Sequence, residues 1–121
     1  EVLKMYSIDG GHAELPGQAY YSQKVCCSGP ELGTSCSATK NSIILKLSSV
    51  TNAHVEENNL SNYTNNACLS TADDYDVVCS YASDCSTIGP EYECLASISD
   101  TTNAHIGDCD TFATKVCCNV Y

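Results

Sequence analysis

Residues 47–69, LSSVTNAHVEENNLSNYTNNACL, decide the fold, because two further versions of this stretch occur in the same chain. The first version is residues 5–27, MYSIDGGHAELPGQAYYSQKVCC, and the third is residues 98–118, ISDTTNAHIGDCDTFATKVCC. Repetition at this length indicates a supersecondary unit that buries its apolar face only against its neighbours. The three versions align on one shared histidine, which is His12, His54 and His105.

The aligned versions agree at three further positions. An apolar residue precedes each histidine by seven positions: Met5, Leu47 and Ile98. An aromatic residue follows at a distance: Tyr21, Tyr63 and Phe112. A cysteine comes five residues after each aromatic: Cys26, Cys68 and Cys117. Each version therefore predicts a hairpin-like repeat, which consists of a strand, a polar turn carrying the histidine and a returning strand. The three repeats span about residues 3–28, 45–70 and 94–119.

Strand signals dominate the rest of the chain. Residues 43–47 and 76–81 are β-branched or alternating runs, and turn residues recur between such runs. No long segment holds the apolar stripe of an amphipathic helix. We expect one all-β domain over residues 1–121, a small disulfide-stapled β-sandwich built from three related hairpin-like repeats.

Ten cysteines in 121 residues indicate a disulfide framework formed in an oxidising compartment. None of the close cysteine pairs has the spacing of a zinc knuckle. Adjacent cysteines on a strand point to opposite faces, so each is expected to bond a different neighbour. The predicted disulfide residues are Cys26, Cys27, Cys36, Cys68, Cys79, Cys85, Cys94, Cys109, Cys117 and Cys118.

One pairing follows from comparing the versions. Cys94 and Cys109 occur together around the third histidine, and both are absent around the second, so we predict that they bond each other. Cys27–Cys36 and Cys79–Cys85 are weaker candidates for short loop closures.

The net charge of −10, with five Lys+Arg residues, excludes a nucleic-acid partner, because binding phosphates requires clustered basic residues. No run of 18 apolar residues is present, so no transmembrane segment is predicted. Together with the cysteines, these features predict an extracellular or cell-surface location.

The three equivalent histidines allow two interpretations. In the first, each ring hydrogen-bonds within its own turn, as the preceding Asn and Thr residues favour. In the second, His12, His54 and His105 meet on an axis and bind zinc or copper. The sequence favours the first interpretation, so no cofactor is predicted. No catalytic motif is present, and an enzyme is not expected.

Two overlapping sequons lie in the second repeat. Asn59-Leu60-Ser61 and Asn62-Tyr63-Thr64 both match N-x-[ST]. In a secreted protein they predict N-linked glycans on Asn59 and Asn62.

The phrases TNAHVE, TNAHIGDCD and KVCC resemble a repeat of uncharacterised Cys-rich secreted or surface proteins of uncultivated microbes, including small-genome archaea. The resemblance covers about residues 3–27 and 45–118, and the first version departs from it with Gly10-Gly11 in place of Asn-Ala. It implies a surface protein, such as a subunit of an extracellular fibril.

The leading functional hypothesis is therefore a structural subunit of an extracellular filament, a homopolymer joined head to tail. The N-terminal strand could add to the sheet of the next subunit. Its assembly residues would be Val2, Leu3, Met5 and Tyr6; ordinary pairing within the chain is the alternative. A second hypothesis is a carbohydrate- or surface-binding module with a tyrosine platform, drawn from Tyr20, Tyr21, Tyr63, Tyr75, Tyr81 and Tyr92. A third is a metal-binding protein that uses the three histidines.

Overall fold

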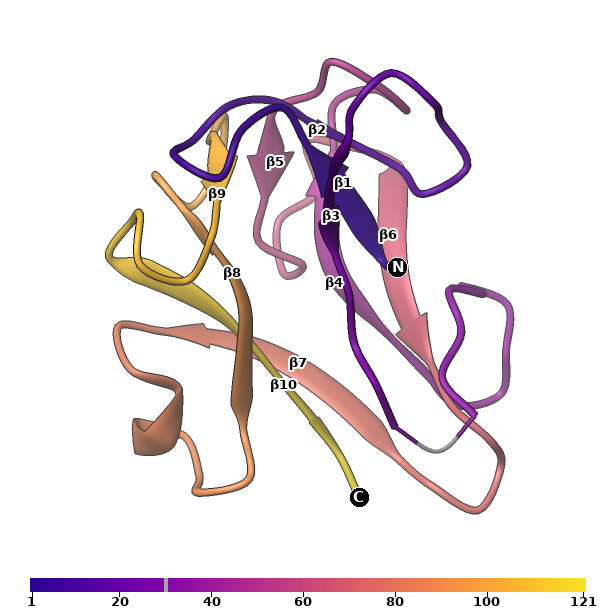
Figure 1. The fold of residues 1–121 in the computed structure, drawn as a ribbon. Helices are drawn as coiled ribbons and strands as arrows, with labels where there is room; N and C mark the ends of the chain where they lie inside the picture. The colour runs from indigo at the N-terminus through magenta and orange to yellow at the C-terminus, as the bar shows by residue number, and fades with distance from the viewer. Residues whose placement is uncertain (30) are drawn as a thin grey trace.

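A computed structural model describes residues 1–29 and 31–121, and these residues form an all-β fold stapled by disulfides, as predicted (Figure 1). No helix among them is long and apolar enough to cross a bilayer. The elements are β1 (Leu3–Met5), β2 (Ala13–Glu14), β3 (Gln23–Val25), β4 (Asn41–Leu47), β5 (Val55–Glu56), β6 (Asn65–Ser70), β7 (Val77–Ala82), the 3-10 helix η1 (Cys85–Thr87), β8 (Glu93–Ile98), β9 (Ile106–Gly107) and β10 (Thr114–Val120).

The strands form three antiparallel sheets, where a simple sandwich has two. Their orders are β2-β1-β3, β5-β4-β6 and β9-β8-β10, and β7 extends the last sheet along the outer edge of β10. In each unit, the residue seven positions before the histidine pairs with the residue directly after the histidine. The three pairs are Met5↔Ala13, Leu47↔Val55 and Ile98↔Ile106. The three versions of the sequence therefore fold into equivalently paired units.

The three units close into a ring at the histidine turns. The residue after one histidine pairs with the residue before the next, through reciprocal backbone hydrogen bonds of 2.9–3.0 Å. The three pairs are Ala13–Ala53, Val55–Ala104 and Ile106–Gly11. No unit is terminal in this ring, so each apolar face is covered by another unit.

The core lies between the sheets and consists of short aliphatic side chains. The largest apolar side chains that are fully buried are Leu3, Ile44, Leu45, Leu47, Leu69, Ile98, Ile106, Val55 and Val116. Val77, Val78 and Leu95, three apolar residues of strands β7 and β8, are only half-buried.

Gly10 explains why the first repeat departs from the Asn-Ala pattern. The position two before each histidine has a positive φ: 111° at Gly10 and 48° at both Asn52 and Asn103. Asn tolerates this left-handed conformation, but a Cβ at Gly10 would lie 2.8 Å from Cζ of Phe112. Glycine is therefore required where the first and third units meet.

Four disulfides join eight of the ten cysteines. Cys94–Cys109 is confirmed. The two short loop closures are wrong, because Cys36 bonds Cys68 and Cys79 bonds Cys118. Cys117 bonds Cys85, so the adjacent residues Cys117 and Cys118 do bond different neighbours.

Cys26 and Cys27 differ from the other eight cysteines. Neither has a disulfide partner within the described part of the chain, contrary to the expectation that all ten are paired. Cys26 is exposed and Cys27 is half-buried.

The proposed assembly strand lies inside its own sheet. β1 is the central strand between β2 and β3, and Val2, Leu3 and Met5 are buried in the core. Tyr6, which follows the strand, is 69 % exposed. The chain therefore adopts the alternative of ordinary intramolecular pairing, and strand addition by these residues would first require β1 to leave its sheet.

Candidate metal centre

Ring closure sets the direction of the three histidine side chains. Each histidine lies between two residues that pair with the neighbouring units, and Ala13, Ala53, Val55, Ala104 and Ile106 among them are fully buried. Because successive side chains of an extended segment point to opposite faces, the histidine between two inward residues points outward. All three histidines therefore emerge on one face, around the centre of the ring.

Backbone hydrogen bonds hold each histidine in place. The carbonyl of His54 accepts from the amide of Ser48 at 3.0 Å, and the amide of His54 donates to Ser48 Oγ at 3.0 Å. His105 makes the same two bonds with Ser99, at 3.0 and 2.9 Å. The carbonyl of His12 accepts from the amide of Tyr6 at 2.9 Å.

The three imidazole rings are in mutual contact. Their centroids are 4.6 Å apart for His12–His54, 5.2 Å for His12–His105 and 5.4 Å for His54–His105. One ring nitrogen from each histidine can be chosen so that all three lie within 4.8 Å of one another. Three converging imidazole nitrogens are a recurrent ligand set for zinc and copper.

The tautomer of His12 follows from its partner. Its Nδ1 lies 2.6 Å from Oδ1 of Asn52, which can only accept, so Nδ1 carries the proton and Nε2 presents its lone pair. The hydroxyl of Tyr21 donates to the same Asn52 oxygen at 3.2 Å. Metal-binding histidines commonly have such an outer partner, which fixes the ring and its tautomer.

The electrostatic surroundings of His54 favour its neutral form. Burial lowers the pKa of His54, and the neighbouring His12 and His105 lower it further. Neutral imidazole is the form that coordinates metal ions, so the direction of this shift at His54 suits a metal ligand.

One side of the cluster is open. His105 is exposed, while His12 and His54 are half-buried. A pocket of about 380 Å³ adjoins the rings, with His12, His105, Asn52 and the tyrosines Tyr6 and Tyr21 in its wall. A cation held by three imidazoles would keep a coordination position open toward this pocket.

The two acidic residues nearest the histidines in sequence, Glu14 and Glu56, are structural. Both are 0 % exposed. Glu56 accepts from the amides of Asn62 and Tyr63, from Asn62 Nδ2 and from Thr102 Oγ1, at 2.8–3.0 Å. Glu14 accepts from Tyr20, Tyr21 and Thr51 in the same way. Each carboxylate therefore links its own loop to the next unit of the ring.

These hydrogen bonds determine the titration of Glu56. Burial alone would raise its pKa, but the donors from Asn62, Tyr63 and Thr102 outweigh burial and hold the pKa below the ordinary value of 4.5. The third unit has Gly107 at this position, and there Ser97 Oγ accepts from the amide of Phe112 at 2.9 Å.

The predicted glycosylation sites lie on the surface. Asn59 and Asn62 are both exposed, in the loop after β5, and Asn62 Nδ2 donates to Oε1 of Glu56. Glycosylation of either residue stays a prediction.

Only two of the six candidate tyrosines are exposed. Tyr20 and Tyr75 are exposed, whereas Tyr21, Tyr63, Tyr81 and Tyr92 are half-buried. The hydroxyl of Tyr81 is tied to the carbonyl of Ile44 at 2.5 Å. Tyr21 instead packs edge-on against Tyr6, with centroids 5.8 Å apart, beside the histidines.

The sequence singled out the three histidines that lie together in the structure, but it favoured a separate role for each in its own turn. The missing signal was ring closure: three equivalent turns that pair cyclically place equivalent side chains around one axis. No protein-family model matches the chain, and no significant match is found among curated proteins or solved structures.

Proposed function

We propose that this chain is a metal-binding module of an extracellular protein, in which His12, His54 and His105 together bind one zinc or copper(II) ion. The observation that carries the proposal is the convergence of the three ligand nitrogens within 4.8 Å. Four disulfides are compatible with the oxidising environment of a secreted protein.

The cluster is close to the size that such an ion requires. Nitrogens that each lie about 2.0–2.1 Å from a tetrahedral zinc are about 3.3 Å apart. The nitrogens lie within 4.8 Å of one another, so binding would draw them closer together. We expect rotation of the imidazole rings about their side-chain bonds to supply this approach.

The ligand set favours particular metals. Imidazole nitrogens suit zinc, copper and nickel, whereas calcium and magnesium prefer oxygen ligands. The buried carboxylates of Glu14 and Glu56 are engaged by loop donors and provide no such oxygen. One ligand from each unit means that a bound ion would also fasten the three units together.

The test is metal binding by the purified apoprotein. Titration calorimetry is expected to give one zinc or copper(II) ion per chain, and the copper(II) EPR spectrum is expected to show nitrogen ligands. His54→Gln should weaken binding by at least about 100-fold, because losing a ligand costs more than losing an outer-shell partner. Asn52→Ala, which frees Nδ1 of His12, should weaken binding about 10–100-fold.

The matched control addresses nonspecific binding by the acidic surface. Asp73→Asn/Asp74→Asn removes two exposed carboxylates outside the cluster and should leave the affinity unchanged. Equal affinity of the His54→Gln variant and the parent protein would refute the histidine site.

A second candidate function is that of a fibre subunit, and one observation favours it. Strand β3 lies at the edge of its sheet and is followed by Cys26 and Cys27, which have no disulfide partner in the described part of the chain. Open sheet edges are sites of strand addition between chains. Negative-stain microscopy of the native secreted material should then show fibres of regular width, and dispersed particles alone would remove this candidate.

A further inference from the structure

Within the described residues, Cys26 and Cys27 lack disulfide partners, whereas both other repeats have a disulfide at the equivalent position. Cys26 corresponds to Cys68 and Cys117, since each comes five residues after the shared aromatic. Cys68 and Cys117 are both bonded to a cysteine 32 residues earlier. The first repeat has the two equivalent cysteines, and the described residues contain no segment that bonds them.

In the other two repeats the bonded segment runs along the returning strand. β7 pairs antiparallel with β10, and Cys79 lies directly opposite Cys118. Beside β6, Gly33 and Ser70 exchange two backbone hydrogen bonds of 2.9 Å. β3 pairs with β1 on one side and with no other described strand, so its outer edge is the equivalent position left open.

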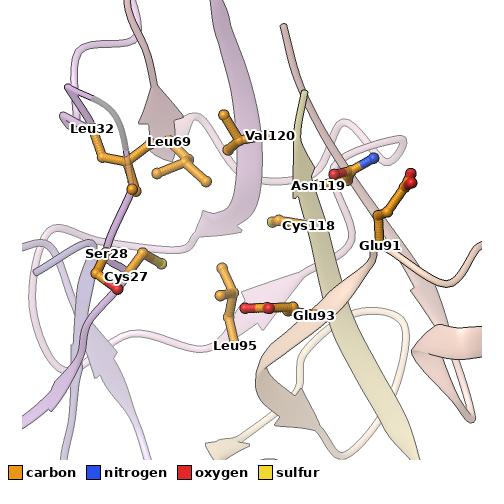
Figure 2. A pocket seen from close by; sticks show the side chains of 11 residues that line it. Cys27, Ser28, Leu32, Leu69, Glu91, Glu93, Leu95, Cys118, Asn119 and Val120 are labelled. Carbon is orange, nitrogen blue, oxygen red and sulfur yellow. The ribbon is translucent and has the colours of Figure 1, made fainter. Parts of the chain in front are cut away.

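The space beside β3 also corresponds to the space that β7 fills. β7 lies between β10 and β4, where the amide of Cys79 donates to Ser42 Oγ at 3.0 Å. Leu47 of β4 and Ile98 of β8 hold equivalent positions in their repeats. Ser42 and Glu93 each lie five residues before them, so these two residues also correspond. Glu93 and Cys27 line a pocket of about 190 Å³, together with Leu95 (Figure 2). The pocket therefore lies beside β3 at the position equivalent to the one that β7 occupies beside β10.

We propose that the open edge of β3 is the acceptor site for an extended strand, supplied from outside the described residues, that carries two cysteines in the C-x(5)-C spacing of β7 and η1. The first cysteine of that strand would bond Cys27, as Cys79 bonds Cys118, and the second would bond Cys26, as Cys85 bonds Cys117. Every other cysteine of the described chain is already paired, so the strand comes from outside these residues. The proposal does not depend on metal binding.

The bonds form by thiol–disulfide exchange with a small-molecule disulfide such as oxidised glutathione. A cysteine thiolate attacks the glutathione disulfide and releases one glutathione, and the partner thiolate then attacks the mixed disulfide and releases the second. Each protein disulfide consumes one oxidised glutathione and yields two glutathione thiols. Cys26 is exposed and reacts first, whereas burial raises the pKa of Cys27, which bonds once the strand is aligned.

The probe is a synthetic peptide of residues 76–86, DVVCSYASDCS, which reproduces β7 and the start of η1. The folded chain is incubated with this peptide in a buffer of reduced and oxidised glutathione. Mass spectrometry is expected to give one peptide per chain with the loss of four hydrogen atoms. Peptide mapping should join Cys27 to the first peptide cysteine and Cys26 to the second, and hydrogen exchange of the β3 amides should slow.

Two controls separate strand pairing from simple thiol chemistry. A peptide with Val77→Pro and Tyr81→Pro keeps both thiols but cannot pair along β3, and its capture should be about tenfold lower or less. The protein variant Cys26→Ser/Cys27→Ser should capture neither peptide and should unfold at the same temperature as the parent. Equal capture of the two peptides, a Cys26–Cys27 bond, or a disulfide-linked dimer that excludes the peptide would each overturn the proposal.

Discussion

Glu56→Ala is expected to lower the free energy of unfolding by about 3–5 kcal/mol, because it removes a buried charged acceptor and leaves its donors unpaired. The carboxylate accepts four hydrogen bonds and is 0 % exposed. Three donors come from the loop of its own unit and one, Thr102 Oγ1, comes from the next unit. The substitution therefore weakens both a loop and a junction of the ring. Urea unfolding followed by circular dichroism measures the change.

Glu56→Gln removes the charge of the side chain and keeps nearly the same shape, so it tests the contribution of the charge. A glutamine amide offers one accepting oxygen, and its NH₂ group would face donors, so about half of the loss is expected. Glu91→Gln, at an exposed position, is the matched control and should be neutral. If Glu56→Ala unfolds as easily as Glu91→Gln, the carboxylate does not hold the ring.

The same residue gives a pH dependence with a defined sign. Because the pKa of Glu56 is held below its ordinary value of 4.5, its stabilising contribution is present above pH 4.5. The contribution is lost as the pH falls below 4.5 and through the lowered pKa of the folded state. The Glu56→Gln variant should lack this part of the acid destabilisation.

Zinc is expected to stabilise the apoprotein by about 2.7 kcal/mol when free zinc is 100 times the dissociation constant. The ion would bind the folded ring, which brings one histidine from each unit within 4.8 Å, and the unfolded chain has no such arrangement. The shift should grow with the logarithm of the zinc concentration. Thermal unfolding at several zinc concentrations measures it.

The control for this zinc-dependent stabilisation keeps zinc in the buffer and removes one of the three histidines. His105→Gln changes an exposed side chain, so the apoprotein should keep its stability while the zinc-dependent increase is lost. An equal increase in the variant and the parent would mean that zinc acts elsewhere. Chelation with EDTA should reverse the increase in the parent alone.

Local patterns predicted the strands and one disulfide correctly. Runs of β-branched and apolar residues such as residues 43–47 became strands, because strand propensity is a local property of the chain. Cys94–Cys109 could be inferred because both residues are present in one repeat and absent in another. Cys36–Cys68 and Cys79–Cys118 could not, since they depend on which segment lies beside which returning strand.

The sequence by itself determined the all-β class, the three equivalent hairpin-like stretches and the histidine carried by each polar turn, because these depend on residues close together in the chain. Only the tertiary structure decided that the turns pair in a closed ring. Closure needs contacts between residues about 40 or more positions apart, such as Ala13 with Ala53. It brings the three imidazoles together and leaves the edge of β3 open beside Cys26 and Cys27. Both features are products of how whole units pack, which no single repeat encodes.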